Sequence, residues 1–272
     1  MHAASEIAYR GAEDVLRDAL GAGDSPAMRV AEDFFGLSDL VRTDARLRRA
    51  LTDPSRSAQD KSALARDAFG SALTPESLRT VDALVAAHWS HPADLHDVLE
   101  VLGIVTTMED AKRAGKLDVV ETEIFEVSEF LQEHRDLRND LSDLALRSRH
   151  DRADLAQMIF APHVSVWSMR LLRRGVGRTS HGRLLATLRR FAERAAAIQS
   201  RRLVMVESAS PLGASQVERL RQILSRRFGE DVTVNVAVDP SLIGGFRIVS
   251  GTTAVDSSLS TQVHQLKREW VH

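Results

Sequence analysis

The sequence predicts an α+β protein, mostly α, in which two tandem helical-bundle modules are followed by a small α/β domain. Three observations support this fold class. Apolar residues recur with helical spacing from about residue 7 to residue 200, the two halves of that region resemble each other, and valines alternate strictly from residue 232. We place the two modules at residues 1–112 and 113–202 and the α/β domain at residues 203–272.

The helical region contains residues that typically begin and end helices. Thr74, Pro75 and Glu76 indicate a helix start, because they supply an N-cap oxygen, a fixed φ and an acid in the first turn. Glycines and prolines predict breaks between helices of about ten to twenty residues. The predicted breaks are Gly21, Gly23, Pro26, Gly70, Pro92, Gly103, Pro162, Gly175 and Gly177.

A pattern of residues in the first half of the helical region recurs in the second half. Two amphipathic helices rich in leucine and arginine can resemble each other by chance, but a nearly constant offset favours a duplicated module. At an offset of 90, Phe35, Ser38, Leu47, Arg48, Leu51 and Asp53 correspond to Phe125, Ser128, Leu137, Arg138, Leu141 and Asp143. At an offset of 91, Asp60, Lys61, Leu64 and Phe69 correspond to Asp151, Arg152, Leu155 and Phe160.

The C-terminal part predicts strands and helices that form a short mixed sheet with helices covering it. Residues 202–206 and 246–249 have the composition of short strands, and the valines between residues 232 and 238 have the period of a half-buried strand. A helix from about Ala214 to Phe228 is expected between Gly213 and Gly229. Its apolar stripe comprises Val217, Leu220, Ile223, Leu224 and Phe228, and a terminal helix would place Leu259, Val263, Leu266 and Trp270 on one face.

The composition limits the classes of function. The chain has 36 basic and 38 acidic residues among 272 and no cysteine, which excludes disulfides and thiolate chemistry. It has no run of about 18 apolar residues and no signal peptide, so any membrane association is expected to run through a partner. One tyrosine and three tryptophans argue against a surface that stacks nucleic-acid bases.

Charge is distributed unevenly along the helical region. Acids outnumber bases by nine between Asp94 and Asp143, whereas arginines outnumber acids by ten between Arg147 and Arg202. One interpretation is a basic face that binds an acidic amphipathic helix. The alternatives are mutual neutralisation within the fold, solvated helix surfaces, and a freestanding helical adaptor or nucleic-acid-binding regulator that uses the 147–202 surface. The arginines that we assign to partner binding are Arg170, Arg173, Arg174, Arg178 and Arg183.

No motif predicts an active site or a metal site. His88, His91 and His96 form the one histidine cluster, but Pro92 interrupts a helix there, so a solvated helix end is favoured over a metal site. The segment from Gly175 to Gly177 lacks the Lys-Ser/Thr of a phosphate loop and is interpreted as a turn between helices. No Gly-x-Ser-x-Gly elbow is present. We therefore expect no catalytic residue, metal, cofactor or small-molecule substrate.

The run from Val238 to Ile248 is the most informative motif of the chain. Its Asp-Pro step ends a strand because proline has no N–H, and its Gly-Gly step permits backbone angles that other residues resist. We interpret the motif as fold-defining or partner-facing, with Leu242 filling the core beneath the turn. Its residues are Asp239, Pro240, Leu242, Gly244, Gly245, Arg247, Ile248 and Gly251.

This run, together with residues 255–258 and the expected terminal helix, resembles the C-terminal signature of the ATP synthase delta subunit family. That family includes the oligomycin-sensitivity-conferring protein (OSCP) of mitochondria. Leu137, Arg138 and the segment from Arg174 to Arg178 resemble landmarks of the single N-terminal bundle of the family. By this resemblance, residues 1–112 are an additional, degenerate copy, as in the long bacterial form.

The resemblance implies a non-catalytic peripheral-stalk subunit of the proton-translocating ATP synthase. Its N-terminal bundle would bind N-terminal helices of alpha subunits, and its C-terminal domain would join the b-type stalk, so that the stator resists the torque of the rotor. The front copy would add a second stalk contact. The chain would lie at the cytoplasmic face of the cell membrane, held there through the complex, and no nucleic-acid partner is implied.

Overall fold

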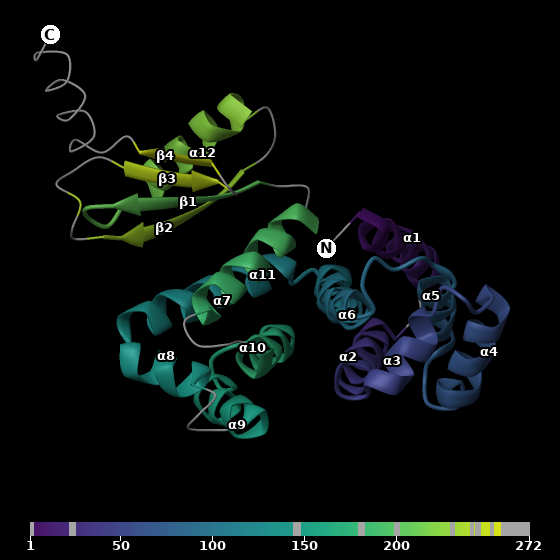
Figure 1. The fold of residues 1–272 in the computed structure, drawn as a ribbon. Helices are drawn as coiled ribbons and strands as arrows, with labels where there is room; N and C mark the ends of the chain where they lie inside the picture. Colours follow the sequence, from purple (N-terminus) through teal and green to yellow (C-terminus); the bar gives the residue numbers. More distant parts are fainter. Residues whose placement is uncertain are drawn as a thin grey trace, which may run out of the picture. The chain divides into compact units, whose positions relative to one another are not determined.

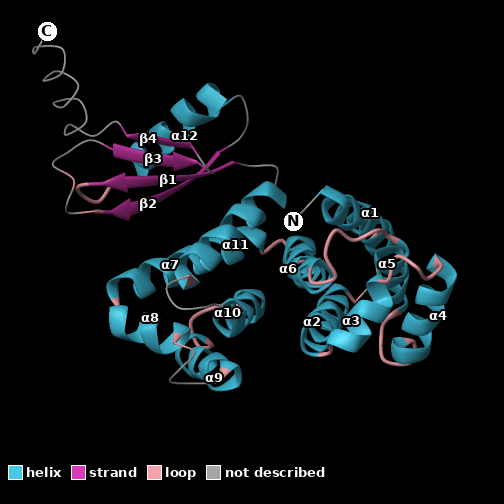
Figure 2. Cartoon of the chain, viewed as in Figure 1, coloured by secondary structure: helices cyan, strands magenta, loops and turns pink. Residues whose placement is uncertain are grey.

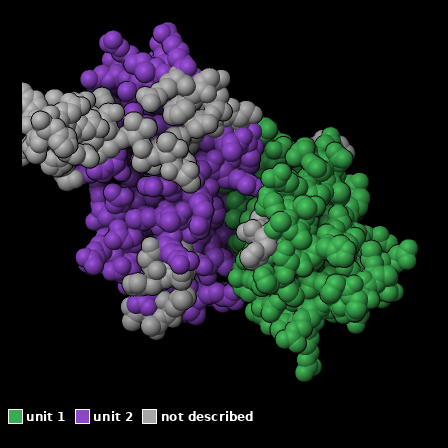
Figure 3. All heavy atoms as spheres, turned by 45° about the horizontal axis from the view of Figure 1, so that its top comes forward, with its two compact units in different colours: residues 1–114 green, residues 115–272 purple. Residues whose placement is uncertain are grey.

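A computed structural model of the chain divides it into two compact units, residues 1–114 and 115–272 (Figure 3). No helix among the described residues is long and apolar enough to cross a membrane. The structure describes residues 3–21, 26–143, 148–178, 183–198, 202–228, 232–239, 242, 246–250 and 253–256.

Unit 1 is a bundle of α-helices around one apolar core (Figure 1). Phe34, Leu84 and Leu102 are fully buried in this core. The sixth helix packs along the second, and the first packs along the fifth. The helices are α1 (Ala3–Leu20), α2 (Ala27–Thr43), α3 (Ala45–Thr52), α4 (Ala58–Phe69), α5 (Pro75–Ala86) and α6 (Asp94–Arg113).

Local capping explains where several of these helices begin. The predicted start at Thr74 and Pro75 is confirmed, because the Thr74 side chain accepts a hydrogen bond from the backbone N–H of Ser77 and Pro75 opens α5. The Asp44 carboxylate accepts two backbone N–H groups at the start of α3. Each cap satisfies backbone donors that have no partner within the helix.

Unit 2 begins with five helices in the same order and of similar length as α2 to α6. The first of them packs along the last, and the third packs along the fourth, as do α2 with α6 and α4 with α5 in unit 1. The helices are α7 (Leu117–Glu133), α8 (Arg135–Ser142), α9 (Arg149–Phe160), α10 (Val166–Arg178) and α11 (Leu184–Ile198).

The same hydrogen bonds occur at corresponding corners of the two helical bundles. In unit 1 the Arg48 guanidinium donates to the carbonyls of Val41 and Arg42 at 2.8 and 3.0 Å. In unit 2 the Arg138 guanidinium donates to the carbonyls of Leu131 and Gln132 at 3.0 and 3.1 Å. These contacts support the idea of a duplicated module; the division of the chain into three domains stays a prediction.

Unit 2 ends in a mixed sheet with a helix on one face (Figure 2). The strand order is β2-β1-β3-β4, with β2 parallel to β1, and β3 antiparallel to both β1 and β4. Leu224 of the helix packs against Val204, Val206 and Val232. The elements are β1 (Arg202–Ser208), α12 (Ala214–Phe228), β2 (Val232–Val238), β3 (Phe246–Ser250) and β4 (Thr253–Asp256). The predicted fold class, mostly α with a small α/β part, is confirmed.

Three predicted helix breaks are wrong. Gly103 lies inside α6, where a Cβ atom would come within 2.5 Å of the Phe35 ring. Gly175 and Gly177 lie inside α10, and a Cβ atom on Gly175 would come within 3.3 Å of the Phe191 ring. At Gly103 and Gly175 the missing side chain serves close packing between helices, whereas a Cβ atom on Gly177 would meet no atom within 4 Å.

Other predictions need smaller corrections. Strand β1 extends two residues beyond the expected end, and β4 was not expected at all. Ile223 was assigned to the buried stripe of α12, but its side chain is 52% exposed. Gly229 and the expected terminal helix lie outside the described residues.

Candidate helix-docking surfaces

Helices α1 and α5 of unit 1 contact each other through small side chains. Alanines recur every four residues on one face of α1, and two more recur with the same spacing at the end of α5. Because alanine and glycine leave no bulk between the helices, a hollow of about 400 Å³ remains. Its lining residues are Ala4, Ile7, Ala8, Gly11, Ala12, Ala83, Ala87 and His88.

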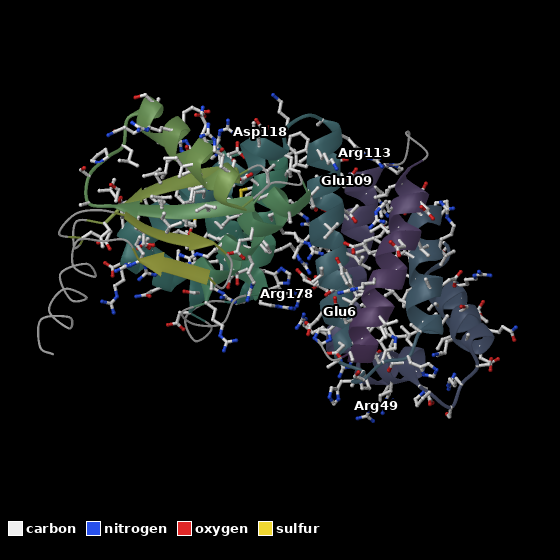
Figure 4. All side chains as sticks on the ribbon, turned by 90° about the horizontal axis from the view of Figure 1, so that it is seen from above. Glu6, Arg49, Glu109, Arg113, Asp118 and Arg178 are labelled. Carbon is white, nitrogen blue, oxygen red and sulfur yellow. The ribbon has the colours of Figure 1, made fainter. Side chains whose placement is uncertain are left out.

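The rim of this α1/α5 groove is apolar and open. The side chain of Ile7 is 72% exposed at the rim, and a Cβ atom on Gly11 would meet no atom within 4 Å. Glu6, labelled in Figure 4, forms an exposed ion pair with Arg10 at 3.3 Å. An exposed isoleucine beside alanines is suited to the apolar stripe of another helix.

Hydrogen bonds fix the position of α1 in the bundle. The buried Ser5 hydroxyl donates to the Asp94 carboxylate at 2.6 Å and accepts the backbone N–H of Ser90 at 3.2 Å. Asp94 begins α6, and Ser90 lies between α5 and α6. The groove is therefore anchored at the end where Ala4 and His88 line it.

The predicted arginine surface of unit 2 lies mainly on α10. Arg170, Arg174 and Arg178 are spaced by four residues and share one side of the helix, and all three are half-buried. Burial lowers the pKa of the Arg178 guanidinium (Figure 4). Arg173 points to α9 instead, where it contacts Asp154 at 3.2 Å and Gln157 at 3.3 Å. Arg183 is exposed just before α11.

The two surfaces occupy corresponding positions in the two units. At the offset of 91, Arg174 and Arg178 of α10 correspond to Ala83 and Ala87, which line the α1/α5 groove. The arginines are predicted from the sequence, whereas the groove is not. The signal that could have found it is the spacing of Ala4, Ala8 and Ala12 along a helix that exposes Ile7.

The C-terminal motif is held together by polar contacts around β1 and β3. The Arg247 guanidinium contacts the carboxylates of Glu207 at 2.8 Å and Asp239 at 3.9 Å. The backbone N–H of Asp239 donates to the Ser208 carbonyl at 2.8 Å, and Leu242 is buried as predicted. These contacts support the fold-defining interpretation of the motif. Pro240, Gly244, Gly245 and Gly251 lie outside the described residues.

The three histidines of the predicted cluster are separated by the fold. His88 and His91 are exposed beyond the end of α5, whereas His96 is buried in α6, so the expectation of a solvated helix end is wrong for His96. Burial, and then the nearby Arg42, lower the pKa of the His96 imidazole. Within the described part of the chain, no group of three His, Cys, Asp or Glu residues is placed to hold a metal ion.

Comparison with known proteins gives consistent results. Residues 106–269 match the family model described as ATP synthase delta (OSCP) subunit. A protein named ATP synthase subunit delta from Kineococcus radiotolerans is 35% identical, covering 97% of this chain and 95% of its own. Proteins of the same name are 33% identical in Salinispora tropica, covering 97% and 96%, and 32% identical in Nocardia farcinica, covering 99% and 99%. The relatives therefore match unit 1 as well as unit 2.

Proposed function

Because the chain belongs to the ATP synthase delta (OSCP) subunit family, we propose that it is a stator subunit that ties the catalytic head of the F-type ATP synthase to its peripheral stalk. In this role the protein binds partners and resists torque, and the chemistry and the proton path belong to other subunits. It is held at the cytoplasmic face of the membrane through the complex.

The proposed mode of binding rests on the α1/α5 groove. Its lining consists of alanine, glycine and isoleucine with one histidine at the end. A partner helix with an apolar stripe between α1 and α5 would cover Ile7. Burial of this apolar surface would stabilise the complex. N-terminal helices of alpha subunits are the proposed occupants.

The α10 surface is proposed to bind a second helix of the same kind in unit 2. Arg174 and Arg178 correspond in position to groove residues of unit 1, which supports a shared mode of binding. The arginines suit acidic residues beside the apolar stripe of that helix. The duplicated bundle would then hold two head helices at once, instead of adding a second stalk contact through its front copy.

The proposal is tested by titration calorimetry of the full chain against a peptide of the alpha-subunit N-terminus from the same organism. Saturable binding of micromolar strength or tighter is expected. Gly11→Leu places a side chain in the groove and should remove binding at unit 1, while Arg183→Glu should weaken binding at unit 2 and decrease its salt dependence.

Gly36→Leu is the matched control for the groove variant. Gly36 is also an exposed helical glycine whose Cβ atom would meet no atom within 4 Å, but it lies on α2, away from the groove. The control should bind as the wild type does. Equal binding by the Gly11→Leu and Gly36→Leu variants would contradict docking in the groove, and no binding by the wild type would contradict the proposed contact with the head.

A further inference from the structure

The first turn of α6 contacts both α2 and α1 (Figure 1). Asp94 and His96 are two residues apart in this turn, so their side chains point to opposite sides of the helix. On one side the Asp94 carboxylate accepts the Ser5 hydroxyl of α1 at 2.6 Å. On the other side the buried His96 imidazole lies near Arg42 of α2. A change at His96 therefore acts on the same helical turn that anchors α1.

Polar contacts hold this turn of α6 against α2. The Ser38 hydroxyl of α2 lies 2.9 Å from the His96 carbonyl oxygen and 3.1 Å from the Glu100 carboxylate. The Arg42 guanidinium contacts the Asp97 carboxylate at 3.2 Å, and the same carboxylate lies 3.5 Å from Nε2 of the imidazole. These contacts join α2 to α6 directly beside the residue that anchors α1.

The surroundings of His96 oppose a positive charge on its imidazole. Burial is the main cause of the lowered pKa of His96, and repulsion from Arg42 of α2 and Arg48 of α3 adds to it. Asp97 and the backbone of Ala93 favour the charged form, but they do not outweigh the other effects. Protonation places a third positive charge beside two arginines at a buried position. Movement of the turn towards water would relieve this charge.

We propose that protonation of His96 displaces the first turn of α6 and loosens the α1 wall of the α1/α5 groove, so that acid weakens binding of a partner helix at unit 1. The inference rests on the proposed function, because it assigns a regulation to the groove proposed there. The path to the groove is short. Ser5 follows Ala4, which lines the groove, and accepts the backbone N–H of Ser90, two residues beyond the groove residue His88.

The coupling between the groove and His96 is reciprocal, as for any two linked binding sites. A helix held between α1 and α5 keeps α1 in place, and with it the turn of α6 in which the imidazole is buried and neutral. Binding of that helix should therefore lower the pKa of His96 further. Burial of His96 without a connection to the groove would not produce this change.

The test measures binding of the alpha-subunit peptide to the full chain at about pH 7.5 and about pH 5, on either side of the usual pKa of histidine. Binding at unit 1, which is the part that Gly11→Leu removes, should weaken about three- to tenfold on acidification. His96→Gln keeps a neutral polar side chain, so it should bind as the wild type does at the higher pH and weaken less at the lower pH. Ser5→Ala breaks the link between α6 and α1 and should weaken binding at both pH values.

Two further measurements report on the coupling directly. NMR titration of the His96 imidazole should give a lower pKa with the peptide bound than in the free chain. Backbone amide exchange of α1 at about pH 5 should be faster in the wild type than in the His96→Gln variant, because the loosened helix opens more often. Exchange of α7 in unit 2 is the internal control and should be the same in both proteins.

Three outcomes would overturn the inference. If the peptide binds, but with the same pH dependence in wild type and His96→Gln and no change in the pKa of His96, the imidazole does not regulate the groove, although the proposed function stands. If α1 exchanges equally fast in both proteins, protonation does not loosen α1, whether or not the peptide binds. If the wild type binds no peptide at either pH, both the proposed contact with the head and its regulation are wrong.

Discussion

The carboxylate of Glu123 holds the start of α10 by accepting both the backbone N–H of Ser165 at 2.9 Å and its hydroxyl at 2.6 Å. The corresponding contact in unit 1 has the same chemistry. There the Asp33 carboxylate accepts the backbone N–H of Thr74 at 2.8 Å and its hydroxyl at 2.9 Å, at the start of α5. An acid on one helix thus fixes the N-terminus of α5 in unit 1 and of α10 in unit 2, the helices to which we assign the proposed docking surfaces.

Ser165→Ala should destabilise unit 2 by about 1–2 kcal/mol, because the Glu123 carboxylate loses a charge-assisted hydrogen bond and α10 loses its cap. Ser165→Thr retains the hydroxyl and should restore most of the loss. Urea unfolding followed by fluorescence of Trp167, in variants in which the other tryptophans are replaced, measures the change. An unchanged unfolding midpoint for Ser165→Ala would show that the contact does not stabilise the bundle.

Gly103→Ala should destabilise unit 1 by about 1–2 kcal/mol despite the higher helix propensity of alanine. The new Cβ atom would lie 2.5 Å from the buried Phe35 ring, so either the ring or the helix must move. Phe35→Leu in the same chain should relieve part of this clash. Thermal unfolding of the single and double variants measures both effects.

Gly36→Ala is the control for this prediction, because a Cβ atom there would meet no atom within 4 Å. It should stabilise the chain by about 0.5–1 kcal/mol through helix propensity alone. Equal stabilisation by Gly103→Ala would mean that the contact between α6 and Phe35 is looser than the structure indicates.

Much of the fold could be predicted from local sequence, because capping residues and periodicity act over a few positions. Thr74 and Pro75 begin α5, and the alternating valines form β2. The role of Gly103 could not be predicted in this way, since it depends on Phe35, which is distant in sequence. In sequence alone a glycine suggests the end of a helix. Gly103 instead lies inside α6, where its missing side chain leaves space for the Phe35 ring.

The docking surfaces could be predicted only in part, for a similar reason. The arginines of α10 could be predicted because charged residues are identified directly from the sequence. Their partial burial could not be predicted, because it depends on how α10 packs against other helices. The α1/α5 groove exists because Ala83 has a small side chain and Gly11 has none, and it forms only where the two helices pack together. Ile223 fits a helical stripe by spacing, yet α12 rests on the sheet along a narrower line.

The stability of unit 1 should decrease as the pH falls below 6.5, the usual pKa of histidine. Burial and Arg42 lower the pKa of His96 in the folded state, so the unfolded chain binds a proton first. The contribution of His96 is therefore fully present above pH 6.5 and is lost as the pH falls towards the lowered pKa. Arg48 opposes protonation as well, whereas Asp97, 3.5 Å from the imidazole, favours it.

The measurement is the free energy of unfolding of wild type and His96→Gln across this pH range. The difference between the two should change with pH, because glutamine does not titrate. Parallel pH profiles for wild type and His96→Gln would show that the burial of this imidazole does not affect stability.

Arg247→Ala should weaken the pairing of β1 with β3 by about 1 kcal/mol, because the Arg247 guanidinium lies 2.8 Å from the Glu207 carboxylate at paired positions of the two strands. Both side chains are partly exposed, which limits the effect through solvent screening. A double-mutant cycle with Glu207→Gln isolates the pair and should give a coupling energy of about 0.5–1 kcal/mol.

Arg219→Ala, which removes an exposed arginine on α12, is the control and should show no coupling to Glu207. If the coupling is zero while stalk binding is lost, Arg247 acts in the partner contact, and the fold-defining interpretation of the C-terminal motif is wrong at this residue.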